Sequence, residues 1–206
     1  QLFFVGYWMY GFAGISLFEL LNPFVELTFG EQYLFQRNIV LILCIDFFIN
    51  GIRKSVLIFK ESMGLFWYDR YKALAEAVLN LGISIILVKN FGVWGVFAGT
   101  FCSTVLTSVW VEPYILYKHR FHRPVKEYFQ NYAECLLVMT AVWSLTDWIC
   151  HFINGGIFTQ LFLRSLLCVA VPNLLLWLIF RRTEKWEKMS GLLKRIFKKV
   201  KKSLRR

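Results

Sequence analysis

The residues best suited to chemistry in this sequence are charged and amide side chains that recur at helical spacing inside long apolar stretches. One set shares a single helix face and comprises Asp46, Asn50, Arg53 and Lys54. A second set keeps a four-residue step and comprises Lys72, Glu76, Asn80 and Ser84. Charges at membrane depth are costly and usually face a cavity or a partner, so both faces are candidates for a wet path.

Two further stretches carry polar faces of the same kind. Residues 1–29 place Ser16, Glu19, Pro23 and Glu26 on one face, and residues 92–117 carry the hydroxyls of Thr100, Ser103, Thr104, Thr107 and Ser108. Four such faces together are what a water-filled translocation path requires. The alternative is that these groups hydrogen-bond between helices and serve packing alone. Packing is favoured for the hydroxyls and is less favoured for Asp46, Arg53 and Glu76, because charges are poor packing groups.

The last two apolar stretches carry few ionisable groups. Asp147 and Arg164 lie at matching depths if residues 130–152 run outward and residues 158–180 return. Either charge alone is costly in lipid, so an Asp147–Arg164 ion pair with a structural role is expected.

The composition indicates which class of protein positions these groups. The chain has 206 residues, of which 57% are hydrophobic and 18% are charged, compared with about 25% charged residues in ordinary globular proteins. This excludes a disordered chain and disfavours a disulfide scaffold or a soluble domain. The prediction is an all-α, polytopic membrane bundle. Because the chain opens on Gln1 and is apolar at once, we expect a piece of a longer protein.

Six transmembrane helices are predicted, since a span takes about 20 residues. They are placed near residues 1–29, 38–60, 72–88, 92–117, 130–152 and 158–180. Twenty-one of the 24 Lys and Arg residues fall after even-numbered helices or in the tail. The positive-inside rule therefore places both ends of the segment in the cytoplasm. The predicted domains are a transmembrane lobe at 1–182 and a tail at 183–206.

The tail and the loops suggest membrane contact rather than catalysis. Residues 183–206 alternate apolar and basic residues at helical steps, which predicts a basic amphipathic helix on anionic lipid, with a disordered basic tail as the alternative. A nucleic-acid arm is disfavoured because the apolar stripe would be wasted there. The five cysteines form no C-x-x-C pair, and no cofactor, metal site or enzyme site is expected.

An ordered set of short motifs resembles a known family. They are Leu21-Asn22-Pro23-Phe24, Phe29-Gly30, Gly64-Leu65-Phe66, Asp69-Arg70-Tyr71, Asn80, Ser84, Phe91-Gly92-Val93-Trp94-Gly95-Val96, Gly99-Thr100, Trp110, Pro113, Leu116-Tyr117-Lys118, Phe121 and Tyr128-Phe129. In this order they resemble the C-terminal part of bacterial O-antigen-type polysaccharide flippases, in the multidrug, oligosaccharidyl-lipid and polysaccharide exporter superfamily.

The resemblance implies one lobe of a two-lobe transporter in the bacterial cytoplasmic membrane. Its substrate would be an undecaprenyl-diphosphate-linked oligosaccharide, and its partners would be the N-terminal lobe, membrane lipids and the polysaccharide polymerase machinery. A diphosphate needs fixed cations and sugars need polar partners, so the expected substrate-binding residues are Arg53, Lys54, Arg70, Asn50 and Asn80. Carboxylates in poorly solvated sites can take up a proton or sodium, so the expected ion-coupling residues are Glu19, Asp46 and Glu76. Asp46 and Arg53 could instead pair as a gate.

Three other functions compete with this one. A multidrug or cation exporter of the same superfamily would favour acidic groups over Arg53 and Lys54. A membrane scaffold subunit without a substrate would have fully paired polar faces. An integral membrane enzyme is least favoured, because no catalytic arrangement is present.

Overall fold

The described part of the chain folds into seven helices of 20 to 28 residues with short turns between them. The computed structural model describes residues 2–122, 124–153 and 155–203, with the side chains of 66, 193 and 195–203 excepted. The helices are α1 (Leu2–Phe29), α2 (Arg37–Ser62), α3 (Lys72–Phe91), α4 (Val93–Leu116), α5 (Lys126–His151), α6 (Ile157–Phe180) and α7 (Glu184–Ser203). Short helical turns lie at Glu31–Tyr33, Leu65–Asp69 and Tyr117–Phe121, and the described chain holds no strand.

The all-helical prediction is confirmed, and each of the first six helices ends within four residues of its predicted bounds. In the described part of the chain, five helices are long and apolar enough to cross a membrane. They are Leu2–Phe29, Trp67–Phe91, Val93–Phe121, Lys126–His151 and Ile157–Phe180. Helix α2 is equally long, but it carries Asp46, Arg53 and Lys54 along with charges near its ends. A sixth span therefore stays a prediction.

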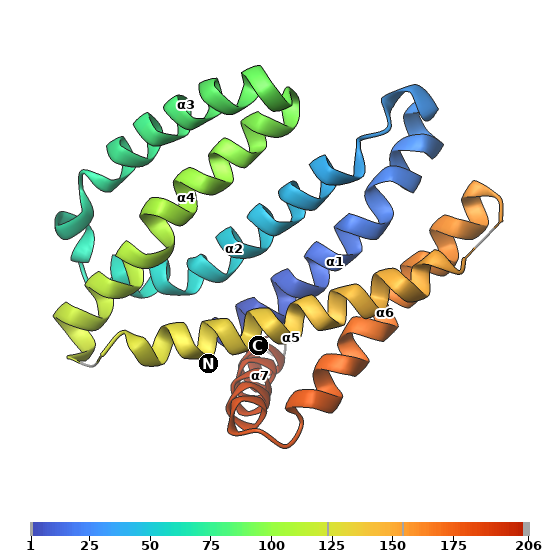
Figure 1. Cartoon of the computed structure of the whole chain (residues 1–206). Helices are drawn as coiled ribbons and strands as arrows, with labels where there is room; N and C mark the ends of the chain where they lie inside the picture. The colour runs from blue at the N-terminus through green and yellow to red at the C-terminus, as the bar shows by residue number, and fades with distance from the viewer. Residues whose placement is uncertain (1, 123, 154, 204–206) are drawn as a thin grey trace.

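The helices run alternately up and down (Figure 1). The connections α1–α2, α3–α4 and α5–α6 lie at one end, and the connections α2–α3, α4–α5 and α6–α7 lie at the other with the N-terminus. Helix α3 packs on α4, α4 on α2, α2 on α1, and α1 on α6, while α5 contacts α6 and crosses α1. The core lies where α1, α2 and α6 meet, around the fully buried side chains of Tyr7, Ile52 and Leu176.

Helix α3 forms the edge of the bundle and contains no buried residue. Its outward face exposes large apolar side chains, namely Leu74, Val78, Leu81, Ile85 and Ile86. An apolar surface of this extent on an edge helix fits contact with lipid rather than with water. The turn into α4 passes through Gly92 at φ +59°, a conformation that favours glycine.

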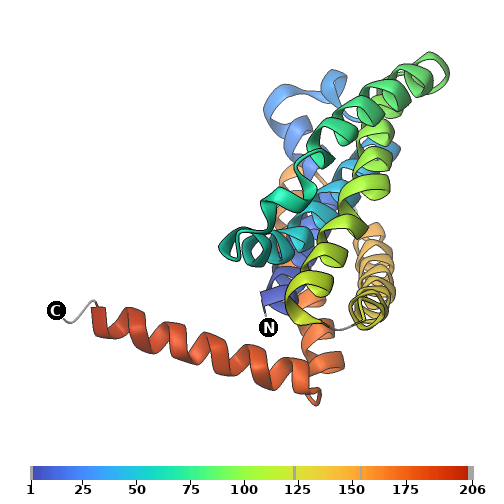
Figure 2. The same ribbon diagram turned by 90° about the vertical axis from the view of Figure 1, so that its left-hand side faces the viewer.

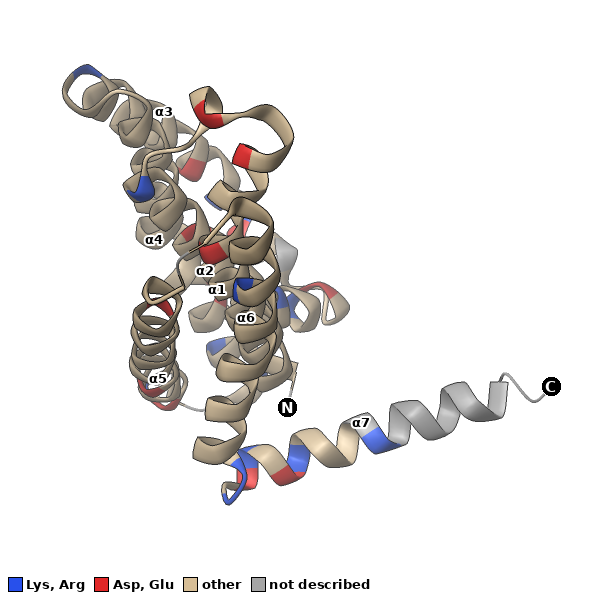
Figure 3. Ribbon diagram, turned by 90° about the vertical axis from the view of Figure 1, so that its right-hand side faces the viewer, with Lys and Arg blue, Asp and Glu red and all other residues tan. Residues whose placement is uncertain are grey.

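Helix α7 leaves the end of α6 and runs crosswise to the bundle, away from its axis (Figure 2). Its first turns are tied to the bundle, since the Trp186 ring lies 5.3 Å from the Trp8 ring and Met189 is buried. Lys and Arg gather along the first half of α7 and at the α6–α7 turn (Figure 3). The predicted tail helix is confirmed as a helix over Glu184–Ser203, and the disordered alternative is wrong for this stretch.

Candidate functional site

The candidate site is a polar seam where α3 and α2 face α4. On α4, one stripe keeps a four-residue step and comprises Thr100, Thr104, Ser108 and Glu112. The stripe from Lys72 to Ser84 on α3 has the same step. Because the two helices are antiparallel neighbours, equal spacing lets the stripes meet along their whole length.

Hydrogen bonds join these two stripes at successive levels. Glu76 accepts from Thr104 Oγ1 at 3.0 Å and from Ser108 Oγ at 2.7 Å. One level further along, Asn80 Nδ2 donates to Thr100 Oγ1 at 3.2 Å, and Ser84 Oγ donates to Asn80 Oδ1 at 3.3 Å. These hydroxyls and amides therefore make the interhelical contacts that the packing alternative expects.

Glycines allow this close approach, as the sequence pattern predicts. A Cβ added at Gly95 would lie 2.4 Å from the Leu87 carbonyl oxygen, and one at Gly99 would lie 2.2 Å from Ser84 Oγ. Small residues that bring two helix backbones together are typical of packing within membranes.

Glu112 is the centre of the charged end of the seam. Its side chain is fully buried and receives two bonds from Arg53, with Nη2 to Oε1 at 2.9 Å and Nε to Oε2 at 3.1 Å. Lys72 Nζ also binds Oε1. Arg53 Nη1 donates to Asn50 Oδ1 at 2.6 Å. One carboxylate thus holds cations from α2 and α3 against α4.

A second carboxylate continues this network towards the loop end. Asp69 binds Lys60 Nζ, and its Oδ2 lies 3.8 Å from Lys72 Nζ. Lys60 is 5% exposed, so the pair is shielded from water. Sequence reasoning did not single out Lys60, Asp69 or Glu112. Glu112 could have been found, because it extends the four-residue step of Thr100, Thr104 and Ser108.

The carboxylates and Arg53 converge rather than scatter. Asp46 lies close enough to Arg53 and Glu76 to interact with both charges. Its Oδ1 is buried without a hydrogen-bond donor among the described residues, while Asn50 Nδ2 donates to the Asp46 backbone oxygen at 3.0 Å. The three predicted residues therefore lie on the same seam.

The other predicted cations lie apart from Arg53. Lys54 Nζ sits 5.4 Å from the centre of the Tyr10 ring on α1. The Arg70 guanidinium stacks over Trp67 at 4.1 Å and Tyr71 at 4.7 Å. Both side chains are exposed, and neither forms an ion pair within the part of the chain that the structure describes.

The predicted Asp147–Arg164 ion pair is wrong. Asp147 Oδ1 pairs instead with Arg37 at the start of α2, and Arg164 Nε is buried without a hydrogen-bond acceptor among the described residues. Matching depth along two helices does not fix their rotation, and Asp147 is turned towards the α1–α2 end of the bundle rather than to a partner on α6.

Arg37→Gln is expected to lower the free energy of unfolding by less than about 1 kcal/mol, because the pair it breaks is open to solvent. The Arg37 and Asp147 side chains are 63% and 36% exposed. Thermal unfolding of the purified protein in detergent, with and without added salt, checks this value. A loss several times larger would mean that the pair is shielded from water.

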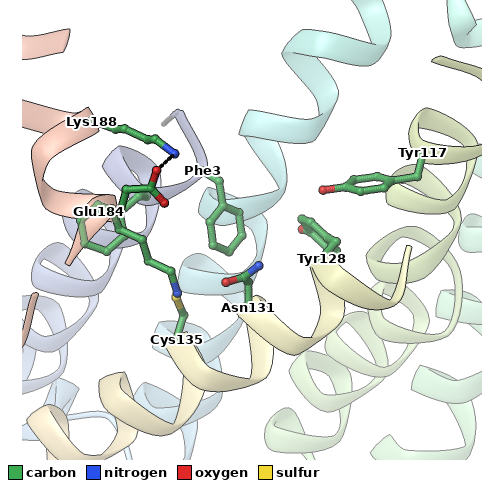
Figure 4. Close-up of a pocket in the computed structure, with 9 residues that line it drawn as sticks. Phe3, Tyr117, Tyr128, Asn131, Cys135, Glu184 and Lys188 are labelled. Carbon is green, nitrogen blue, oxygen red and sulfur yellow. Dashed lines mark ion pairs between the residues drawn. The ribbon is translucent and has the colours of Figure 1, made fainter. Parts of the chain in front are cut away.

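A cavity of about 280 Å³ lies at the loop end, between α1, α5 and the start of α7 (Figure 4). Tyr117 and Tyr128 stand on one side, Glu184 and Lys188 on the other, with Asn131 between them. Glu184 Oε1 lies 2.7 Å from Lys188 Nζ, and this hydrogen bond and charge lower the pKa of the Glu184 carboxyl. The cavity combines aromatic rings with charged groups at the end of the bundle from which α7 departs.

Comparison of the chain with protein-family models, with curated proteins and with solved structures finds no match.

Proposed function

We propose that the chain is the C-terminal six-helix lobe of a flippase that moves an undecaprenyl-diphosphate-linked oligosaccharide across the bacterial cytoplasmic membrane. The observation that supports this most is the convergence of Asp46, Arg53 and Glu76 on the polar stripe of α4. Ionisable groups gathered at membrane depth from separate helices are characteristic of transport paths.

The contacts divide the work among the predicted residues. Lys54 and Arg70 are exposed cations held only by aromatic rings within the described chain, so they are free to bind the diphosphate. Arg53 is committed to Glu112 and Asn50, and it acts as a lock between α2 and α4. Opening that lock during transport would release a cation towards the substrate and a carboxylate towards Lys72.

A non-transporting scaffold subunit is the second candidate. It is favoured by the pairing of Arg53, Lys60 and Lys72 with Glu112 and Asp69, since paired charges can serve stability alone. The two candidates differ in what Arg53 does when its partner is kept but moved.

A charge exchange separates the two candidates. In the complete protein, expressed in cells that lack their own flippase, Arg53→Glu alone brings two carboxylates together and should reduce the protein level. The double variant Arg53→Glu with Glu112→Arg restores an ion pair, so the protein level should recover. If the protein is a flippase, surface polysaccharide should stay absent in the double variant. Recovery of both protein and polysaccharide would assign Arg53 a structural role.

Lys54→Gln is expected to weaken binding of the lipid-linked diphosphate by tenfold or more, a loss on the order of 1.4 kcal/mol or above, because a charge-assisted bond is lost. Lys118→Gln is the matched control, since Lys118 is also exposed and lies 5.3 Å from a tyrosine ring, that of Tyr114. Binding of undecaprenyl-diphosphate-linked oligosaccharide to the reconstituted complete protein measures the difference. Equal losses in both variants would refute a specific role for Lys54.

The remaining features follow from the same proposal. The lysine- and arginine-rich end faces the cytoplasm, α7 lies on the anionic inner leaflet, and the N-terminal lobe completes the cavity. The gene sequence upstream of Gln1 tests the lobe assignment. Eight further hydrophobic spans in frame are expected, and a short soluble leader there would contradict it.

A further inference from the structure

We propose that Glu19 on α1 and Asp147 on α5 share a single proton and form a proton-binding site that exchanges with solvent through the cavity beside Asp147. The site is separate from the α2–α3–α4 seam. Its coupling to transport rests on the proposed function, whereas proton binding itself does not.

Glu19 is the buried half of the site. The residue is only 5% exposed, and its Oε1 atom has no hydrogen-bond donor among the described residues. An ionised carboxylate buried without donors is very costly, so this oxygen requires a proton or another cation.

Asp147 is the solvent-facing half. Its carboxyl lies within hydrogen-bonding range of the Glu19 carboxyl, and two carboxyl groups can be bonded in this way only when one of them carries a proton. Asp147 also pairs with Arg37, which stabilises the negative charge on the Asp147 side. The proton therefore resides on Glu19 and is donated towards Asp147.

A route to water is present. Asp147 lines an open cavity of about 300 Å³ together with Phe18, Leu41, Thr140, Trp143 and Ser144. The Asp147 side chain is 36% exposed, whereas Glu19 lies behind it. When the proton leaves, it passes from Glu19 to Asp147 and then to water in this cavity, and Glu19 is left as a carboxylate.

Arg164 on α6 supplies the partner that this carboxylate then needs. Its Nε is buried without an acceptor among the described residues, and its charge is close enough to act on Glu19. The other titratable groups near Glu19 are the thiols of Cys44, Cys150 and Cys168, from α2, α5 and α6. Proton release thus exchanges a Glu19–Asp147 contact for a Glu19–Arg164 ion pair and draws α6 towards α1.

Infrared spectroscopy of the complete protein in lipid nanodiscs tests the proposal directly. The carbonyl stretch of a protonated carboxylic acid should be present at neutral pH and should shift in heavy water. Glu19→Gln should abolish this band, while Glu31→Gln, which alters an exposed carboxylate at the same end of the bundle, should leave it intact. Absence of the band in the parent protein, or its survival in Glu19→Gln, would overturn the proposal.

Two further arms make the result specific. Asp147→Asn should move the frequency of the band, because the carboxylate that accepts the proton is replaced by an amide, and an unchanged frequency would argue against sharing. Loss of the band when sodium chloride replaces choline chloride at constant pH would identify sodium as the ligand and overturn the proton assignment. If the band behaves as expected while the Lys54 and Arg53 experiments fail, the flippase proposal falls and the proton site stands.

Discussion

Glu112→Gln is expected to lower the free energy of unfolding by about 3–5 kcal/mol, because it removes one partner from a buried ion network. Arg53 and Lys72 would then keep their charges with side chains only 12% and 14% exposed. The glutamine side chain retains the shape of glutamate and could still accept one hydrogen bond, so the loss measures charge rather than packing. Thermal unfolding in detergent, followed by circular dichroism, measures it.

Glu134→Gln is the control for that change. Glu134 also pairs with a lysine, Lys185, but the two side chains are 68% and 34% exposed. An exposed pair contributes about 0–1 kcal/mol, so the midpoint of unfolding should barely move. Similar losses for the two variants would mean that Glu112 is hydrated and that the network is not a buried one.

Gly95→Ala should destabilise the α3–α4 pair by about 1–3 kcal/mol, the usual loss when a methyl group is forced into a packed contact. The new Cβ would meet the Leu87 carbonyl oxygen at 2.4 Å and the Leu87 carbonyl carbon at 2.5 Å. Backbone atoms cannot rotate away, so α3 must shift as a whole. That shift would also lengthen the Glu76 and Asn80 bonds to α4.

Gly82→Ala supplies the opposite result from the same helix pair. No atom lies within 4 Å of a Cβ at Gly82, and the residue is inside α3. Replacing glycine by alanine inside a helix stabilises it by about 0.5–1 kcal/mol. Unfolding midpoints that move in opposite directions for the two variants are expected. A stabilised Gly95→Ala protein would show that the helices do not pack as closely as described.

Periodicity was enough to predict the helices and their polar faces. A helix turns every 3.6 residues, so a four-residue step such as that of Lys72, Glu76 and Asn80 keeps side chains on nearly the same face whatever surrounds it. The same reasoning applied to Gly95 and Gly99 correctly predicted close packing of the fourth helix. These properties depend on one helix at a time.

The partners across helices could not be predicted in this way. Asp147 and Arg164 have matching depths, yet Asp147 reaches Arg37, which is 110 positions away in sequence. Which side chains meet depends on how each helix is rotated and which neighbour it has, and a single sequence does not specify either. Glu112 was missed for a related reason, since it lies beside Pro113 near the helix end and looks like a boundary residue.

The crosswise course of α7 sets the height of the whole bundle in the bilayer. Only residues 181–183 separate α6 from α7, and Trp8 and Trp186 stack across the junction. A rod joined so closely to an upright bundle acts as an outrigger on the membrane surface. Any rocking of α6 during a transport cycle would have to lever α7 against the headgroups, so lipid composition at that surface would affect how readily the lobe moves.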